Sequence, residues 1–295
     1  MSKIKLNVGA SPIWEKEGWH VLDHKVTENS DYRIAGDAVS INLETDQVAT
    51  IFCSHMFEHI PHVRLERILL EFNRILEPDG IVRILTPDLR KLTTAYVNND
   101  KDFFDKILSE DESIRTDMGP GGMLMNFIVS PGQDTALFTR DIGEFIGGYA
   151  HLYCYDFEML SVLLQRTGFH HIEEKAFTES SVTDYSEPLH VVGLAPVWRD
   201  LNQQYYNDND LVHYFDRDEG RYVINFTVTG FDRDPVHSLI LEARKSETVD
   251  PMDYVSLNDS EQNYNHYAWS LLNDPIFANN YRKVTQALGV PNRYE

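Results

Sequence analysis

Apolar residues in the first 90 positions fall in short runs, bounded by turns and separated by polar or amphipathic segments. The runs Ile4–Val8, Ala49–Ser54 and Ile81–Leu85 have the length and the bounds of buried strands. Residues 64–76 carry apolar side chains three and four positions apart, which predicts an amphipathic helix. Strands that alternate with helices predict an α/β fold with a parallel sheet.

After Asp88 the pattern is less regular, but it still predicts defined elements. Asp156 has the position of a helix N-cap, and Gly168 has that of a helix end. We expect helices over residues 89–97, 102–108, 157–166, 267–272 and 281–288, and strands over residues 169–176, 222–228 and 238–243.

Small and acidic residues follow the predicted strands where each strand ends. Gly9 follows the first strand, and Asp23 follows the apolar run 18–22. Asp37 follows a third strand over residues 32–35, and Ser54-His55 ends the fourth. Because the carboxyl ends of parallel strands meet at one edge of a sheet, these residues predict a ligand site at that edge.

Taken in order, these motifs resemble the class I S-adenosylmethionine-dependent methyltransferases of the small-molecule, methyltransferase-11-like type. The resemblance is strongest over residues 35–88, where an acid, a Ser-His-x-x-Glu-His segment and a Pro-Asp-Gly turn follow one another. It implies S-adenosylmethionine as the cofactor. It also implies a Rossmann-like, seven-stranded, mostly parallel sheet with helices on both faces, an inserted lid and a C-terminal helical extension.

The resemblance assigns the cofactor to the ends of the first four strands. The loop after the first strand would contact its methionine end, Asp23 its ribose hydroxyls, and Asp37 with the next backbone N–H its adenine. Asn42-Leu43 is the alternative for the adenine contact, and Ser11 stands where the family has a second glycine. The residues expected to bind the cofactor are Asn7, Gly9, Ala10, Ser11, Asp23, Asp37, Ala38 and Ser54.

Methyl transfer to a hydroxyl group needs a general base, and histidine suits that role near neutral pH. His55 at the end of the fourth strand and His151 in a later segment are the candidate bases, and Asp88 would orient either of them. For each histidine the alternative is a packing role, His55 closing the cofactor pocket and His151 lying in the core.

The same region also carries side chains of the types that bind metal ions. His55, Glu58, His59 and His62 share helix-like spacing, which would suit a group of ligands. His55, however, stands where related metal-dependent methyltransferases have an acid. The sequence therefore predicts no metal, and Glu58 and His59 are expected to make hydrogen bonds to neighbouring loops.

The predicted domain organisation is one methyltransferase domain with additions. Residues 1–245 form the domain, 98–155 a lid-like insertion, 177–235 a substrate-side insertion and 246–295 a C-terminal helical extension. Met, Phe and Gly residues between positions 118 and 148 suit a mobile apolar cover over the active site.

Charge and cysteine content limit the partners. The net charge of −21 disfavours nucleic acid, which attracts basic surfaces. No apolar run is long enough for a membrane span, and the first strand begins too near Met1 for a signal peptide. Two cysteines do not make a disulfide framework, so we expect a cytoplasmic protein that acts on a small molecule. These features are compatible with a homo-oligomer as well as with a monomer.

The function predicted from these residues is O-methylation of a small molecule with S-adenosylmethionine. The resemblance implies an acceptor such as a sugar or a surface-polysaccharide precursor. The alternative is a non-catalytic methyltransferase-like binding module, favoured by Ser11 and by the short segment between Asp23 and Asp37. A nicotinamide oxidoreductase is excluded because no G-x-G-x-x-G opens a helix after the first strand.

Overall fold

The fold is described from a computed structural model. It covers residues 3–10, 14–24, 26, 28–105, 119–129, 151–186, 189, 212–216, 221–224, 237–249 and 283. The chain divides into two compact units, Met1–Asp253 and Tyr254–Glu295, and every element below belongs to the first. The helices predicted over 267–272 and 281–288 lie outside the described residues, apart from Lys283.

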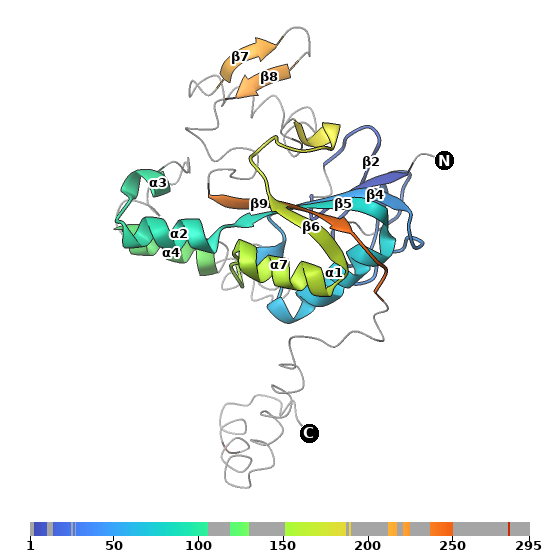
Figure 1. Ribbon diagram of the computed structural model, residues 1–295, viewed down its shortest axis with the longest axis horizontal. Helices are drawn as coiled ribbons and strands as arrows, with labels where there is room; N and C mark the ends of the chain where they lie inside the picture. The colour runs from blue at the N-terminus through green and yellow to red at the C-terminus, as the bar shows by residue number, and fades with distance from the viewer. Residues whose placement is uncertain are drawn as a thin grey trace. The chain divides into compact units, whose positions relative to one another are not determined.

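Seven strands form one sheet in the order β3-β2-β1-β4-β5-β9-β6 (Figure 1). The strands β1 to β5 are mutually parallel, and β9 runs antiparallel to both of its neighbours. This confirms the predicted mostly parallel sheet. The strand bounds are β1 Ile4–Val8, β2 Trp19–Leu22, β3 Arg33–Ile34, β4 Val48–Ser54, β5 Leu76–Pro87, β6 Phe169–Glu174 and β9 Ser238–Lys245.

The register brings the carboxyl ends of the central strands level with one another. Val8 at the end of β1 pairs with Leu22 on one side and with Cys53 on the other. Leu22 in turn pairs with Ile34 at the end of β3. The residues that follow these positions therefore emerge along one edge, which is where open α/β sheets bind ligands.

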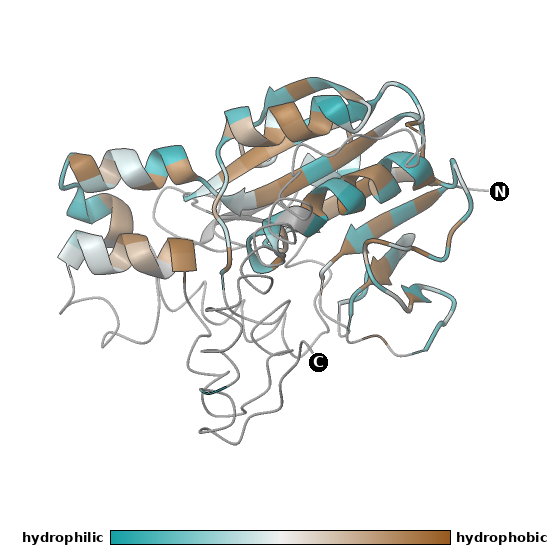
Figure 2. Ribbon diagram, turned by 90° about the horizontal axis from the view of Figure 1, so that it is seen from below, coloured by the Kyte–Doolittle hydropathy of each residue, from teal (hydrophilic) through white to brown (hydrophobic). Residues whose placement is uncertain are grey.

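Two amphipathic helices cover one face of the sheet. The helices α1 (His62–Ile75) and α7 (Phe157–Arg166) lie side by side beneath it (Figure 1). Their apolar faces meet the strands, which are largely hydrophobic in Figure 2. Buried leucines and phenylalanines of both helices join the strand residues in one core, including Leu65, Leu69, Phe72, Leu160 and Leu164.

The other face is covered by aromatic residues from distant parts of the chain. Trp14 and Trp19 meet edge to face, and Tyr185 of the short helix η3 (Thr183–Ser186) packs against Trp19 and Phe52. Tyr185 also hydrogen-bonds Thr50 through its hydroxyl, at 2.6 Å. Within the described residues no helix joins β1 to β2 or β2 to β3.

A small helical group lies beyond the carboxyl end of β5. It consists of α2 (Leu89–Val97), α3 (Lys101–Asp105) and α4 (Gly119–Val129), which share a separate apolar core (Figure 1). A two-stranded sheet of β7 (Val212–Asp216) and β8 (Arg221–Ile224) completes the described elements. None of the helices in these segments is long and apolar enough to cross a membrane.

Most differences from the predicted elements concern their ends. The turn expected at Pro78-Asp79-Gly80 lies inside the bounds of β5, where the pairing with β4 shifts register and Asp79 has φ +62°. The strand predicted over 222–228 is β8, and its partner β7 was not predicted. Residues 106–108 of the helix predicted over 102–108 lie outside the described residues.

A buried ion pair links β5 to β9. Arg83 Nη1 lies 2.6 Å from Glu242 Oε1, and both side chains are almost fully buried. Arg83 also donates to the carbonyl oxygens of Glu179 and Ala176, so it fixes the start of the segment that leads to Tyr185. Removing one member of such a pair leaves the other charge uncompensated.

Replacing Glu242 alone should therefore lower the stability more than replacing both Arg83 and Glu242 with apolar residues. We expect Glu242→Ala to lower the free energy of unfolding by about 3–5 kcal/mol, and Arg83→Met/Glu242→Leu to lower it by less. The exposed pair of Lys3 and Glu77 gives a control, since Lys3→Met should change stability by about 0.5 kcal/mol or less. Urea denaturation measures all three. A double variant as unstable as Glu242→Ala would contradict the expectation.

Candidate active site

The Gly9 turn begins the ligand edge. Gly9 has φ +76°, and its N–H donates to the carbonyl of Leu22 at 2.8 Å. A Cβ atom at this position would lie 2.9 Å from Cγ of Met56, which follows the end of β4. The glycine is thus required both by its left-handed backbone and by the close approach of Met56. Ala10 beside it is buried, and Ser11 lies outside the described residues.

The two acidic residues of the edge differ in environment. Asp23 directly after β2 is buried, with His24 Nδ1 3.5 Å from its carboxylate. Asp37 after β3 is half exposed, and its carboxylate lies 2.7 Å from Arg64 Nη2 and accepts from the N–H of Val39. Ala38 is nearly buried next to it. The structure therefore brings both predicted acids to the edge, with Asp37 engaged by Arg64.

Two buried polar atoms at this edge have no hydrogen-bond partner within the described residues. They are Nδ2 of Asn7 and Oγ of Ser54. Asn7 pairs with Phe52 in the register, and side chains two positions apart on a strand share a face, so Asn7 and Ser54 lie on the same face of the sheet. A buried donor or acceptor without a partner costs roughly 1–3 kcal/mol, so such atoms suit a site that a polar ligand completes.

A buried carboxylate lies beyond Ser54. Glu58 belongs to the short helix η1 (Phe57–His59) and is fully buried. Its Oε1 lies 2.8 Å from Nδ1 of His55, and its Oε2 accepts from the hydroxyl of Thr86. Nε2 of His55 lies 2.9 Å from Oγ of Ser238, at the start of β9. His55 therefore bridges the acid to a hydroxyl group.

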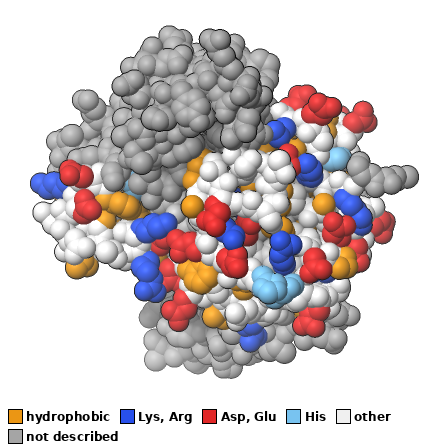
Figure 3. Space-filling view, turned by 45° about the horizontal axis from the view of Figure 1, so that its top comes forward, with side chains coloured by type: hydrophobic (Ala, Val, Ile, Leu, Met, Phe, Trp, Pro, Cys, Tyr) orange, Lys and Arg blue, Asp and Glu red, His pale blue; other side chains and the backbone are white. Residues whose placement is uncertain are grey.

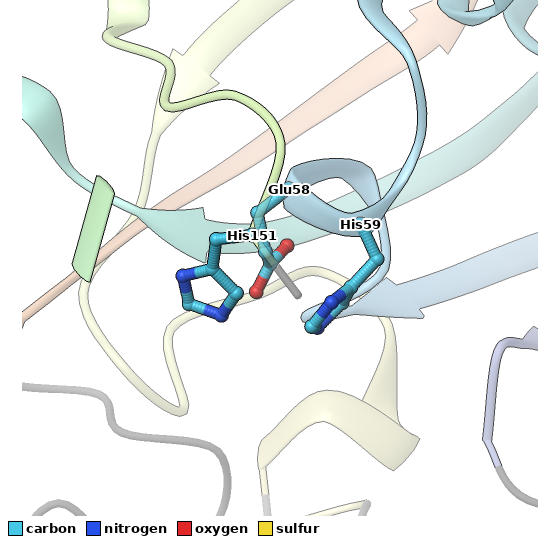
Figure 4. Close-up of side chains that lie close together, drawn as sticks. All are labelled: Glu58, His59 and His151. Carbon is cyan, nitrogen blue, oxygen red and sulfur yellow. The ribbon is translucent and has the colours of Figure 1, made fainter. Parts of the chain in front are cut away.

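Two more imidazole groups complete the cluster. Figure 4 shows the carboxylate of Glu58 between the rings of His59 and His151. One ligand atom from each of these three residues lies within 4.8 Å of the others, and the two rings meet edge to face. His151 is held by a 2.6 Å hydrogen bond between its Nδ1 and the carbonyl oxygen of Phe127 in α4.

The ionisation of the cluster follows from this geometry. Burial opposes the charge of Glu58, but His55, by charge and hydrogen bond, and the more distant His59 and His151 outweigh it and lower the pKa of Glu58 to about 2. Burial lowers the pKa of His151, against the attraction of Glu58. Burial also raises the pKa of the Cys154 thiol to about 12, so Cys154 is protonated and is no nucleophile.

The segment around His151 is tied to η1 by its backbone. The N–H groups of Leu152 and Tyr153 both donate to the carbonyl oxygen of Glu58, at 2.6 and 3.3 Å. The ring of His62 stacks on Tyr153 with 4.4 Å between centroids. These contacts place residues 151–155 against the end of β4. The predicted cover over 118–155 is described only in part, because residue 118 and residues 130–150 lie outside the described residues.

Asp88 has a different setting from the histidines. Its carboxylate caps α2 by accepting from the N–H groups of Arg90 and Lys91, and Lys91 Nζ lies 3.5 Å away. The contacts described for Asp88 thus fix the start of α2, and none of them reaches His55 or His151. A role in orienting either histidine remains a prediction.

Sequence reasoning missed two participants and one contact. Thr86 and Ser238 contact the Glu58–His55 pair, and the contact between His59 and His151 was not predicted. Thr86 and Ser238 sit at ordinary strand-end positions of β5 and β9, so only their pairing in the sheet brings them to the site. The closeness of His59 to His151 depends on the backbone bonds from Glu58 to residues 152 and 153, for which the sequence carries no signal.

The Gly9 turn allows a matched test of stability. Gly9 and Gly18 have nearly the same φ, +76° and +78°, but no atom lies within 4 Å of a Cβ built on Gly18. Gly18→Ala should therefore cost about 1–2 kcal/mol through backbone strain alone. Gly9→Ala should cost more, because Met56 must also move. Thermal unfolding of both variants measures this, and equal losses would contradict it.

A family model described as a methyltransferase domain matches residues 19–84, from β2 into β5. No curated protein matches the chain.

Several solved structures are similar at low identity. An S-adenosylmethionine-dependent methyltransferase from Archaeoglobus fulgidus is 12% identical with a TM-score of 0.37, over 82% of this chain and 86% of that one. The YcgJ protein from Bacillus subtilis is 11% identical with a TM-score of 0.35, over 83% and 93%. Phosphoethanolamine N-methyltransferase 2 from Haemonchus contortus is 13% identical with a TM-score of 0.35, over 83% of this chain and 49% of that one.

Likeness at this level says nothing about the acceptor. The matched domain, however, coincides with the strands whose ends carry Asp23, Asp37 and the Ser-His-x-x-Glu-His segment. The match of residues 19–84 to a methyltransferase domain, on a mostly parallel Rossmann-like sheet, supports a class I S-adenosylmethionine-dependent methyltransferase with S-adenosylmethionine as its methyl donor.

Proposed function

We propose that this protein is an S-adenosylmethionine-dependent methyltransferase that methylates a hydroxyl oxygen of a small molecule. The observation that carries the proposal is the histidine cluster around Glu58, which adjoins the Gly9 turn. Met56 links the two, because it packs against Gly9 and directly follows His55. A group able to remove a proton thus lies beside the loop expected to hold the cofactor.

The chemistry required of the protein is limited. When bound, S-adenosylmethionine supplies a methyl group that is already electrophilic. The residues of the site then have to hold the acceptor in line and remove its proton. A neutral hydroxyl is a weak nucleophile, so the histidines favour an oxygen acceptor over an amine that is already nucleophilic when unprotonated.

We assign the general base to His55. The carboxylate of Glu58 holds Nδ1, which leaves Nε2 as the nitrogen that accepts a proton, as in other carboxylate–histidine pairs. Nε2 already faces a hydroxyl group, that of Ser238. His151 would line the acceptor side, because Phe127 anchors its Nδ1 and its ring points to Glu58 (Figure 4).

The acceptor class follows from charge and from the family resemblance. On the face shown in Figure 3, acidic and basic side chains are interspersed. Together with the net charge of −21, this disfavours a polyanionic substrate such as nucleic acid. A sugar or a surface-polysaccharide precursor fits a site rich in hydrogen-bonding groups. Cys53 and Cys154 are both buried, and neither forms a disulfide within the described residues, which supports a reducing compartment and hence the cytoplasm.

A non-catalytic binding module is the second candidate. It is favoured by the pairing of Asp37 with Arg64, which occupies one predicted cofactor contact, and by the missing helix between β1 and β2 among the described residues. The buried Asp23 and the unpaired atoms of Asn7 and Ser54 favour cofactor binding instead.

The two acids give a direct test of the cofactor site. Asp23→Ala should weaken binding of S-adenosylhomocysteine by roughly 1–3 kcal/mol, since a buried partner is lost. Asp37→Ala should weaken it less, because Asp37 is half exposed and is held by Arg64. Isothermal titration measures both. Wild-type protein that gives no heat with millimolar ligand would rule out the cofactor site.

The two histidines should separate in kinetics. His151→Ala should lower turnover and leave the affinity for S-adenosylhomocysteine nearly unchanged, because its contacts lie on the acceptor side. His55→Ala should lower both, since His55 adjoins Ser54 and Met56. Transfer of labelled methyl to a panel of sugar hydroxyls, together with titration, measures them. The assignment fails if His55→Ala retains wild-type turnover.

A further inference from the structure

We propose that Glu58, His59 and His151 bind a divalent transition-metal ion, for which Zn²⁺ is the representative. The metal would leave a coordination position open for the hydroxyl oxygen of the acceptor. The inference that the ion binds is based on the geometry of the three side chains. Its use in activating the acceptor rests on the proposed function.

The three side chains converge from two separate parts of the chain. Glu58 and His59 are neighbours in η1, and His151 comes from the segment that Leu152 and Tyr153 tie to the Glu58 carbonyl. One ligand atom from each lies within 4.8 Å of the others. Zinc bonds of about 2.1 Å place tetrahedral ligands roughly 3.4 Å apart, so rotation of partly exposed imidazole rings would close the set.

The surrounding contacts orient the ligands as metal sites require. Nδ1 of His151 donates to the Phe127 carbonyl, so Nε2 is the nitrogen that is left to bind an ion. The carboxylate of Glu58 is held from behind by His55 and Thr86. Hydrogen bonds of this kind to the outer atoms of histidine and carboxylate ligands are the usual support of a bound ion.

The donor set selects the type of ion. Two imidazoles and one carboxylate suit Zn²⁺, Fe²⁺, Co²⁺ or Ni²⁺, whereas Mg²⁺ and Ca²⁺ take oxygen ligands. Three protein ligands with a fourth position open are the pattern of catalytic zinc sites. The neighbouring His62 is engaged elsewhere, in stacking on Tyr153 and in a contact to the Tyr155 hydroxyl.

This ligand set differs from the one that the sequence spacing suggests. The spacing groups His55 and His62 with Glu58 and His59, and His55 stands there in place of an acid. In the structure His55 faces Glu58 and Ser238 with its two nitrogens, and His151 supplies the third ligand instead. The lack of an acid at position 55 therefore does not argue against a metal bound by Glu58, His59 and His151.

The ion would help the general base. An acceptor hydroxyl placed on the open position would be polarised by the cation, as in Lewis-acid catalysis. Its O–H bond would then break more readily, so a weaker base would suffice to take the proton. Glu58 would join the two functions, with one oxygen toward the ion and the other toward His55.

Cobalt provides a binding test that does not depend on activity. Titration of the metal-free full chain with Co²⁺ should give a saturable visible absorption with one ion per chain. His59→Ala and His151→Ala should each lower the Co²⁺ affinity at least ten-fold, and Mg²⁺ in excess should not displace the ion. His171→Asn is the matched control, because His171 is exposed on β6 and asparagine tolerates its φ of +46°.

The outcomes separate the metal from the methyl transfer. Loss of the absorption in the two ligand variants, with wild-type circular dichroism and an unchanged His171→Asn variant, supports the site. Wild-type protein without saturable absorption, or ligand variants that bind as tightly as wild type, overturns it. Methyl transfer that persists at full rate after metal removal overturns the role in activation. Cobalt binding by a chain that binds no S-adenosylhomocysteine supports the site and overturns the proposed function.

Discussion

The burial of one carboxylate constrains the whole ligand edge. Glu58 has no exposed surface, so its negative charge needs compensation from within the protein. His55 and Thr86 provide it through the side chain, while the backbone carbonyl of the same residue holds the segment after His151. The end of β4, the end of β5 and residues 151–155 are therefore fixed around a single group. Any change in the charge of Glu58 would therefore alter the contacts of all three segments.

The sheet makes that arrangement available to a ligand. Because the strands end level with one another, the turn at Gly9, the buried Asp23 and the η1 segment face the same side. The edge combines polar atoms that lack partners with a turn that tolerates no side chain. Both features are expected of a binding surface for a polar ligand, because the ligand would supply the missing hydrogen bonds.

The sequence predicted the sheet well because buried strands and capped helices leave local signals. Ile4–Val8 and Phe157–Arg166 have the bounds that their apolar patterns and caps predict. The strand-end residues were also found, since a parallel sheet aligns its carboxyl ends. Thr86 and Ser238 were not predicted, and neither was the closeness of His151 to Glu58, because these residues meet Glu58 and its neighbours only through tertiary contacts. The sequence grouped His62 with Glu58 and His59, whereas the structure places His151 beside them, and the cause is again a tertiary contact.

The connection from β1 to β2 has a consequence for how the chain folds. The described part of the chain has no helix on that face beside these strands; Trp14 meets Trp19, Trp19 packs against Tyr185, and Lys5 pairs with Asp184. The first strands thus complete their core only when a segment about 170 residues later in the chain arrives, which raises the contact order of the domain. During synthesis the two tryptophans stay uncovered until that segment leaves the ribosome, a period in which exposed apolar surface invites chaperones or aggregation.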